Sequence, residues 1–262
     1  MDVLDRLKTF YDGYLGEKKI LTKTYGGRDV YALCVNKSPS PKIICQYAIH
    51  GREYITTNLA MKELVHFSTY GKRGTVWFIP MLNPDGVYLS LYHNPKNKAN
   101  LRMVDLNVNF DADWGRGEKN VRFPAPENYI GTKPFSERET RGLRDFTLFI
   151  KPDLTLSYHT KGEEIYFEYG QDNERLVRDG SIAKIISKRT GYKIKSTPNS
   201  VGGYKDWCIK TGKIPSFTIE VGSDNLSHPI TEENFGEIYS KNIGVIKMLT
   251  EIKWLKNLWA KQ

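Results

Sequence analysis

The sequence predicts an α/β protein built as a single domain. Its 262 residues are 39% hydrophobic and 26% charged, which is enough for one sizeable core and does not require a second. Apolar runs of strand length alternate with segments whose apolar residues recur at the helical period. The run from Lys42 to Ile49 is nearly continuous in apolar residues, as is typical of an interior strand covered on both faces.

The first half of the chain predicts a helix, a hairpin and then a strand, a helix and a strand. Residues 3–15 place apolar side chains on one helical face, and residues 20–25 and 30–35 flank Gly26-Gly27-Arg28 as two hairpin strands. The interior strand 42–49 is followed by a helix over 55–70 and a strand over 75–81. Asn83-Pro84-Asp85-Gly86 then predicts a turn.

The second half begins with an irregular connection. Residues 93–116 show no sustained period, yet residues 101–110 are too apolar for solvent, so we expect them to form a wall of the active site. Ser136 and Glu139 have the spacing of a capping box that opens a helix ending near Ile150. The remaining predicted elements are strands over 154–158, 165–169 and 215–222, a helix over 173–190, a short helical piece after Gly202-Gly203, and a long amphipathic helix from Thr231 to about Ala260.

The distribution of charged residues and the search for targeting segments restrict the classes of function that the sequence allows. The 39 Lys and Arg against 30 Asp and Glu permit an acidic partner, but the lysines are scattered singly and no basic run is interleaved with aromatic residues, which argues against a nucleic-acid groove. No apolar run reaches the length of a membrane span, and residues 1–6 lack the pattern of a signal peptide. We expect a monomer in the cytoplasm. Three cysteines without paired spacing predict buried thiols.

A metal site is predicted where strands end. His50 follows the interior strand and Glu53 stands three residues later, so both can reach one ion if the backbone turns between them. Alternatively, His50 caps the strand and Glu53 only stabilises a first helical turn. His159 follows the strand 154–158 in the same way, and two histidines at equivalent strand exits favour a site with these three ligands. Three protein ligands and a place for water describe catalytic zinc, one ion per chain.

Glu220 is the candidate general base. It stands between Ile219 and Val221 near the end of an apolar strand, where a carboxylate is rarely buried without a reason. A base beside an activated water is one such reason, and a structural salt bridge to a lysine is the alternative.

Five motifs then carry a family resemblance. They are His50-x-x-Glu53, Asn83-Pro84-Asp85-Gly86, Asp105-Leu106-Asn107-x-Asn109-Phe110, His159 and Phe217-Thr218-Ile219-Glu220. In order and rough spacing they resemble zinc carboxypeptidases of the carboxypeptidase A type, over almost the whole chain from about Tyr25 to Gly222. The resemblance implies a mixed, mainly eight-stranded sheet flanked by helices, with zinc at the strand ends. It also implies that Arg52 and Asn107 line the substrate pocket.

Within that family, residues 159–166 and 202–207 look most like bacterial γ-D-glutamyl-diamino acid endopeptidases. That likeness implies hydrolysis of the peptidoglycan stem peptide, or of a muropeptide, between D-glutamate and diaminopimelate or lysine. Sporulation, wall recycling and turnover of imported muropeptides remain open as biological settings, and the likeness adds a spore compartment to the cytoplasm as an expected location. A C-terminal metallocarboxypeptidase or a deacylase on the same fold is the alternative function, and a catalytically dead wall-binding module would require a lost ligand or base.

Some positions depart from the family pattern. The arginine that grips a substrate's terminal carboxylate in typical carboxypeptidases is replaced by Val108, so a bidentate clamp is missing. The arginine that stabilises the oxyanion aligns with Lys98, which leaves that role to Lys98 or to nearby Arg102. The tyrosine that covers the substrate aligns near Pro198, so its role is vacant or passes to Tyr204.

Overall fold

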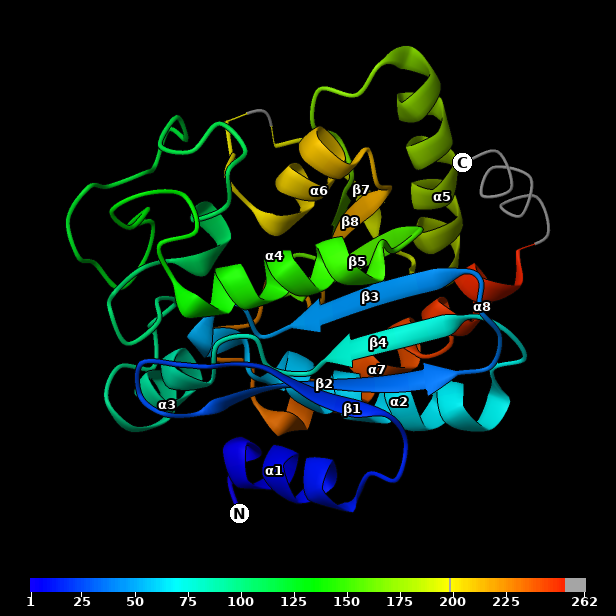
Figure 1. Cartoon of the computed structure of the whole chain (residues 1–262), viewed down its shortest axis with the longest axis horizontal. Coiled ribbons are helices and arrows are strands. Elements are labelled where there is room, and N and C mark those ends of the chain that lie inside the picture. Colours follow the sequence, from blue (N-terminus) through cyan, green and yellow to red (C-terminus); the bar gives the residue numbers. More distant parts are fainter. Residues whose placement is uncertain (198, 253–262) are drawn as a thin grey trace.

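The structure is a computed structural model that describes residues 1–197 and 199–252. One eight-stranded sheet runs through it in the order β1-β2-β4-β3-β5-β8-β6-β7, with helices on both faces (Figure 1). The predicted fold class, a single α/β domain with a mixed eight-stranded sheet, is confirmed. The predicted tail of the last helix, residues 253–260, lies outside the described residues.

The sheet is mixed: its central pairs are parallel, antiparallel pairs flank them, and the edge strand β7 pairs in parallel with β6. β3 pairs in parallel with β4 and β5, and β5 pairs in parallel with β8, whereas the β1-β2, β2-β4 and β6-β8 pairs are antiparallel. The strands are β1 Lys18–Lys23, β2 Asp29–Asn36, β3 Lys42–Tyr47, β4 Thr75–Ile79, β5 Leu154–His159, β6 Glu164–Tyr166, β7 Lys193–Ile194 and β8 Ser216–Glu220. Every strand predicted from the sequence is present, and β7 is an addition.

The helices bury the two faces of the sheet in separate hydrophobic clusters. Helices α2, α5, α7 and α8 cover one face, and α4 and α6 cover the other. The α-helices are α1 Val3–Gly13, α2 Ile55–Tyr70, α3 Pro84–Tyr92, α4 Arg138–Ile150, α5 Asn173–Thr190, α6 Tyr204–Gly212, α7 Phe235–Asn242 and α8 Val245–Glu251. Short 3-10 helices span Gly51–Glu53, Leu106–Val108 and Glu232–Asn234.

Three local predictions need correction. The predicted turn at residues 83–86 opens helix α3, because the side chain of Asn83 accepts the Gly86 N–H and Pro84 stands at the first helical position. The predicted capping box is wrong, since Glu137 is the residue that precedes α4 and the Ser136 hydroxyl donates to its carboxylate at 2.7 Å. The long C-terminal helix is divided at Gly244, which takes the left-handed conformation with φ 88°.

A buried carboxylate ties together the two strands that lead to the predicted histidine ligands. Tyr47 on β3 and Tyr158 on β5 are paired neighbours whose rings stack at 4.6 Å between centroids. Both hydroxyls donate to Glu63 of α2, at 2.5 and 3.3 Å, and Glu63 is 2% exposed. Burial raises the pKa of Glu63 to about 8.

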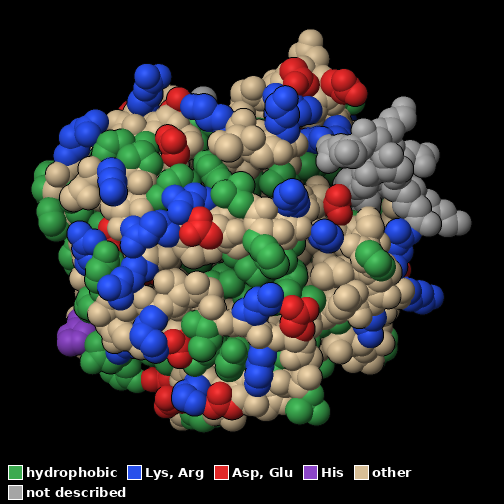
Figure 2. All heavy atoms as spheres, in the orientation of Figure 1, with side chains coloured by type: hydrophobic (Ala, Val, Ile, Leu, Met, Phe, Trp, Pro, Cys, Tyr) green, Lys and Arg blue, Asp and Glu red, His purple; other side chains and the backbone are tan. Residues whose placement is uncertain are grey.

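The surface carries its basic residues in a dispersed arrangement. On the face shown in Figure 2, Lys and Arg side chains lie among acidic and neutral ones. Within residues 1–197 and 199–252, no helix has the length and apolar character that crossing a membrane requires.

Candidate metal centre

The parallel strands bring the three predicted ligands to one edge of the sheet. His50 follows the end of β3, Glu53 lies in the 3-10 helix that comes next, and His159 is the last residue of β5. Because β3 and β5 are adjacent and in register from Ile43 with Leu154 onwards, their carboxyl ends meet at the same height. Ligand sites of open α/β sheets lie at such ends.

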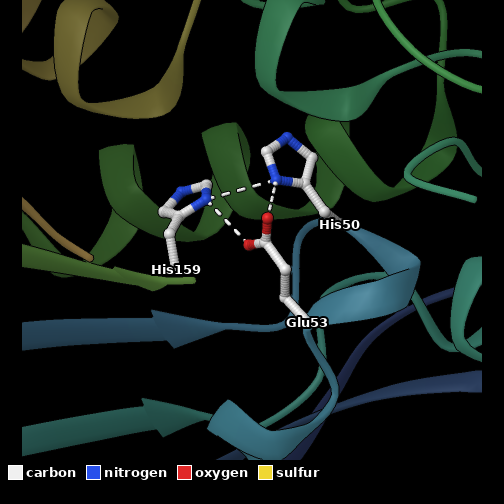
Figure 3. A group of neighbouring side chains, drawn as sticks. All are labelled: His50, Glu53 and His159. Carbon is white, nitrogen blue, oxygen red and sulfur yellow. Dashed lines mark hydrogen bonds and ion pairs between the residues drawn. The ribbon is translucent and has the colours of Figure 1, made fainter. Parts of the chain in front are cut away.

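The three side chains converge on a common point (Figure 3). The Nδ1 atoms of His50 and His159 are 3.3 Å apart, and the Glu53 carboxylate places one oxygen 2.8 Å from the first and the other 3.1 Å from the second. All three residues are at most 7% exposed. Among the described residues, this is the one group of three or more potential ligands whose donor atoms lie within 4.8 Å of one another.

These donors fit zinc. Two nitrogens that each lie ~2.0–2.1 Å from a tetrahedral zinc would be separated by ~3.3 Å, which matches the distance between the two Nδ1 atoms. Two imidazoles and one carboxylate are also the donor types of catalytic zinc sites, which leave one position open. His50, Glu53 and His159 are therefore the residues that would hold the metal.

The electrostatics around Glu53 and His50 favour a bound cation. Burial alone would raise the pKa of Glu53, but His50 and His159 outweigh it and hold that pKa well below its usual range. Burial alone would likewise lower the pKa of His50, but Glu53 and Asp105 raise it to about 9. The carboxylates of Glu53 and Asp105 thus make this point in the structure favourable for a positive charge.

Asp105 orients His50 from behind and was not among the predicted site residues. Its Oδ1 lies 3.2 Å from His50 Nε2 and also accepts the Asn107 N–H at 3.0 Å, while its Oδ2 accepts the Asn128 N–H at 3.0 Å. This carboxylate, 2% exposed, fixes the tautomer that leaves Nδ1 free for the metal. The sequence signal was the Asp that begins the 105–110 motif.

Glu220 lies beside the ligands. It is the last residue of β8 and pairs with His159 across the β5-β8 ladder, so its side chain leaves the sheet on the same face. Burial and the nearby Glu53 raise the pKa of Glu220 to about 8, against the opposing charges of His50 and Lys98. A bound cation would lower this pKa further towards the range of a working base.

The structure separates the two candidate oxyanion cations. The carbonyl of Lys98 accepts the Gly51 N–H at 2.9 Å, so Lys98 runs alongside the metal-binding turn, and its charge lowers the pKa of both Glu220 and Asp105. Arg102 points elsewhere, because it donates to the Tyr25 hydroxyl at 2.8 Å and lies 3.7 Å from the Glu137 carboxylate. Lys98 therefore stays the candidate because its charge acts on the carboxylates of the site, and its amine also lies 3.6 Å from the exposed carboxylate of Glu127.

The structure places the predicted substrate-binding residues in different surroundings. Arg52 is partly buried and its Nη1 donates to the Lys96 carbonyl at 3.3 Å, while Asn107 lines a cavity together with Glu220. The prediction for Tyr204 is wrong. Its side chain is fully buried in the core under α6 and its hydroxyl lies 2.8 Å from Thr147 Oγ1, so it has no surface to offer a substrate. Pro198 lies outside the described residues.

Comparisons with known proteins agree with this centre. The family model described as zinc carboxypeptidase matches residues 2–237. A γ-D-glutamyl-L-diamino acid endopeptidase of Lysinibacillus sphaericus is 30% identical over 79% of this chain, which spans 60% of that protein's length. A zinc carboxypeptidase of Simulium vittatum is 28% identical, with 83% and 82% of the two chains covered.

Solved structures repeat the fold. Bovine thrombin-activatable fibrinolysis inhibitor, solved with a tick carboxypeptidase inhibitor, superposes with a TM-score of 0.86 at 21% identity, covering 97% of each chain. The murein-tripeptide amidase MpaA of Escherichia coli O157 superposes with a TM-score of 0.63 at 21% identity, covering 92% and 95%. With the His50, Glu53 and His159 donors in place and the family model matched over residues 2–237, the chain belongs to the zinc carboxypeptidase family.

Proposed function

We propose that the chain is a zinc-dependent peptidase that hydrolyses the γ-D-glutamyl-diamino acid bond of peptidoglycan stem peptides. When bound, zinc acts as a Lewis acid that activates water and polarises the scissile carbonyl. Glu220 takes the proton of the attacking water and returns it to the leaving amine. The amine of Lys98 stabilises the negative charge that develops on the carbonyl oxygen.

The observation that carries the substrate proposal is a polar cavity of about 160 Å³ beside Glu220. Lys205, a residue only 7% exposed, lines it, and its amine donates to Asp206 Oδ1 at 2.5 Å and to the Glu168 carbonyl at 2.9 Å. An ammonium has three hydrogens, so one remains for a ligand. Hydroxyls of Thr197, Ser200 and Thr218 complete a wall that suits a charged side chain better than an apolar one.

The ion pair of Lys205 and Asp206 is complementary to a zwitterionic group on a substrate. The distal end of diaminopimelate carries a carboxylate and an ammonium, which can address Lys205 and Asp206 respectively, whereas the side chain of lysine offers only the ammonium. We therefore place diaminopimelate on the leaving side of the scissile bond. The name of the Lysinibacillus relative supports the same bond, and Val108 supports an enzyme that does not grip a terminal carboxylate.

Mass spectrometry of the products from defined peptides tests the proposal. The purified chain should release diaminopimelate peptides from γ-D-glutamyl-meso-diaminopimelate and cut the L-lysine analogue more slowly. Release of C-terminal residues from ordinary L-peptides, with the γ-glutamyl substrates untouched, would instead establish the carboxypeptidase alternative. The cytoplasmic or spore location and the monomeric state stay predictions.

Lys205→Met keeps most of the buried stem and removes the charge. It should raise KM for the diaminopimelate substrate and reduce the preference over the lysine analogue. An unchanged preference would contradict the assignment of Lys205 while leaving the proposed bond intact.

A further inference from the structure

The side chain of Glu127 lies between two cations beside the metal centre. Its Oε2 atom is 3.6 Å from the amine of Lys98 and 4.0 Å from Arg52 Nη1. The two cations are mostly buried, with 20% and 18% of their side chains exposed, whereas the Glu127 side chain is 50% exposed. A carboxylate at the surface is thus shared by two cations that are largely withdrawn from water.

Backbone hydrogen bonds hold the chain on both sides of Glu127. The Pro126 carbonyl accepts the Lys98 N–H at 2.9 Å. The Asn128 N–H donates at 3.0 Å to Asp105, the carboxylate that orients a metal ligand from behind. The fold therefore sets the place of Glu127 beside the cations, while its exposed side chain can change rotamer without moving the backbone.

The two cations lie close to the reacting groups. The charge of Lys98 opposes the effect of burial on the pKa of both Glu220 and Asp105, which places it within electrostatic reach of the general base. Arg52 belongs to the 3-10 helix that carries Glu53. An ion pair as exposed as that of Glu127 contributes little to stability, so another carboxylate can replace it at small cost.

We propose that Glu127 holds the place of a substrate carboxylate, the α-carboxylate of the D-glutamyl residue, and rotates away when that group binds. A glutamyl residue linked through its γ-carbonyl keeps its α-carboxylate, a short aliphatic chain away from the scissile bond. Because the cavity beside Glu220 is assigned to the leaving amine, the carboxylate at Arg52 comes from the acyl side of the substrate.

The exchange of carboxylates also positions the second cation. The guanidinium of Arg52 can bind the incoming carboxylate with two parallel hydrogen bonds. The departure of Glu127 then releases the amine of Lys98 to the charge that develops on the carbonyl oxygen. The inference rests on the proposed function and deepens it, because it names the group of the substrate that is recognised on the acyl side.

Two peptides test the recognition of the α-carboxylate. They are γ-D-glutamyl-meso-diaminopimelate and its γ-D-isoglutaminyl analogue, in which an amide replaces that carboxylate. The wild type should favour the glutamyl peptide in kcat/KM by about tenfold or more. Arg52→Gln should remove most of this preference, and Arg52→Lys, which keeps the charge without the planar fork, should restore part of it.

Glu127→Gln tests the exchange itself. Removing the charge of the resident carboxylate should lower KM for the glutamyl peptide by about two- to fivefold, the effect of losing an exposed ion pair that competes with the substrate. It should also raise kcat for the isoglutaminyl peptide, since an amide does not displace Glu127 from Lys98 in the wild type. Glu17→Gln is the matched control, because Glu17 is 56% exposed, lies 3.5 Å from the amine of Lys19 and precedes β1. The control should leave both kinetic constants unchanged.

The outcomes separate this inference from the proposed function. If Glu127→Gln raises KM for the glutamyl peptide, Glu127 itself contacts the substrate or holds the cations in place, and the inference is overturned. Equal kcat/KM of the wild type for the two peptides would also overturn it, because the α-carboxylate would then have no partner in the site. In both cases the proposed bond stands. If the wild type cuts neither peptide, the proposed function fails, and the inference fails with it.

Discussion

Replacing Asp105 with Asn should weaken zinc binding without removing a zinc ligand. The carboxylate of Asp105 accepts three hydrogen bonds, from His50 Nε2, Asn107 N and Asn128 N. An amide has only one accepting atom in place of two. If its oxygen faces His50 and Asn107, the NH₂ group confronts the Asn128 N–H. If it is flipped, the NH₂ group confronts His50 Nε2 and favours the tautomer that protonates Nδ1.

Either orientation of the amide at position 105 should cost free energy of zinc binding and of folding. Loss of an outer partner of a metal-bound histidine typically lowers metal affinity 10–100-fold, which is about 1.4–2.8 kcal/mol. The opposed donors in the buried site should also reduce the free energy of unfolding by ~1–3 kcal/mol. We therefore expect a folded protein that binds zinc at least tenfold more weakly than the wild type.

Competition against a chromophoric chelator measures the zinc affinity, and thermal unfolding measures the stability of the same samples. Asp153→Asn is a matched control, because Asp153 also accepts a backbone N–H, from Lys42 at 2.7 Å, at the opposite end of β3. The control should change zinc affinity less than twofold. A zinc affinity for Asp105→Asn within twofold of the wild type would refute the role given to this carboxylate.

Four further outcomes are expected. Glu220→Gln should retain zinc, measured by elemental analysis, and lose turnover by roughly 10²–10⁴-fold; near-normal turnover would place the base elsewhere. Lys98→Met should lower kcat by about tenfold or more whereas Arg102→Met should change it far less, and the reverse order in steady-state kinetics would exchange their roles. Val108→Arg should impair cleavage of the γ-glutamyl substrate, because it desolvates a charge that this substrate does not pair; increased endopeptidase turnover would contradict that reasoning. In the folded protein Glu63 keeps its proton up to about pH 8, whereas in the unfolded chain it releases the proton near its usual pKa. Its contribution to the free energy of unfolding is therefore full below that usual pKa and is lost as the pH rises to about 8. Tm should fall over this pH interval in the wild type and fall less in Glu63→Gln, and equal slopes of Tm against pH would exclude Glu63 as the cause.

The ligands were predictable because strands end where apolar runs end. The periodicity around residues 42–49 and 154–158 located two strand exits, and the parallel register then brings His50 and His159 together. Tyr204 was misplaced because a glycine pair marks where a helix begins and does not say which side chains face the core. The choice between Lys98 and Arg102 needed coordinates, since the irregular connection has no period from which directions can be read.

Helix α3 shows a second limit of structure prediction from the sequence pattern alone. Asn83 and Pro84 are residues of turns and also of helix starts, and the sequence pattern alone does not separate the two uses. The side chain of Asn83 donates to the Ile49 carbonyl at 3.0 Å as well as capping the helix, so this motif fixes the backbone just before His50. Such a contact between residues 34 positions apart leaves no local signal.

The Glu63 contact also bears on how the predicted metal ligands are positioned. Tyr47 and Tyr158 directly precede the segments that carry the ligands, and a single carboxylate holds both hydroxyls from behind. The contact therefore fixes the ends of β3 and β5 relative to each other, and the chain itself holds the donor atoms at a spacing that suits zinc. In this respect the centre is the opposite of a zinc finger, in which the metal organises the polypeptide. Here hydrogen bonds outside the donor set, from Tyr47 and Tyr158 to Glu63, help to hold the strands that carry the ligands.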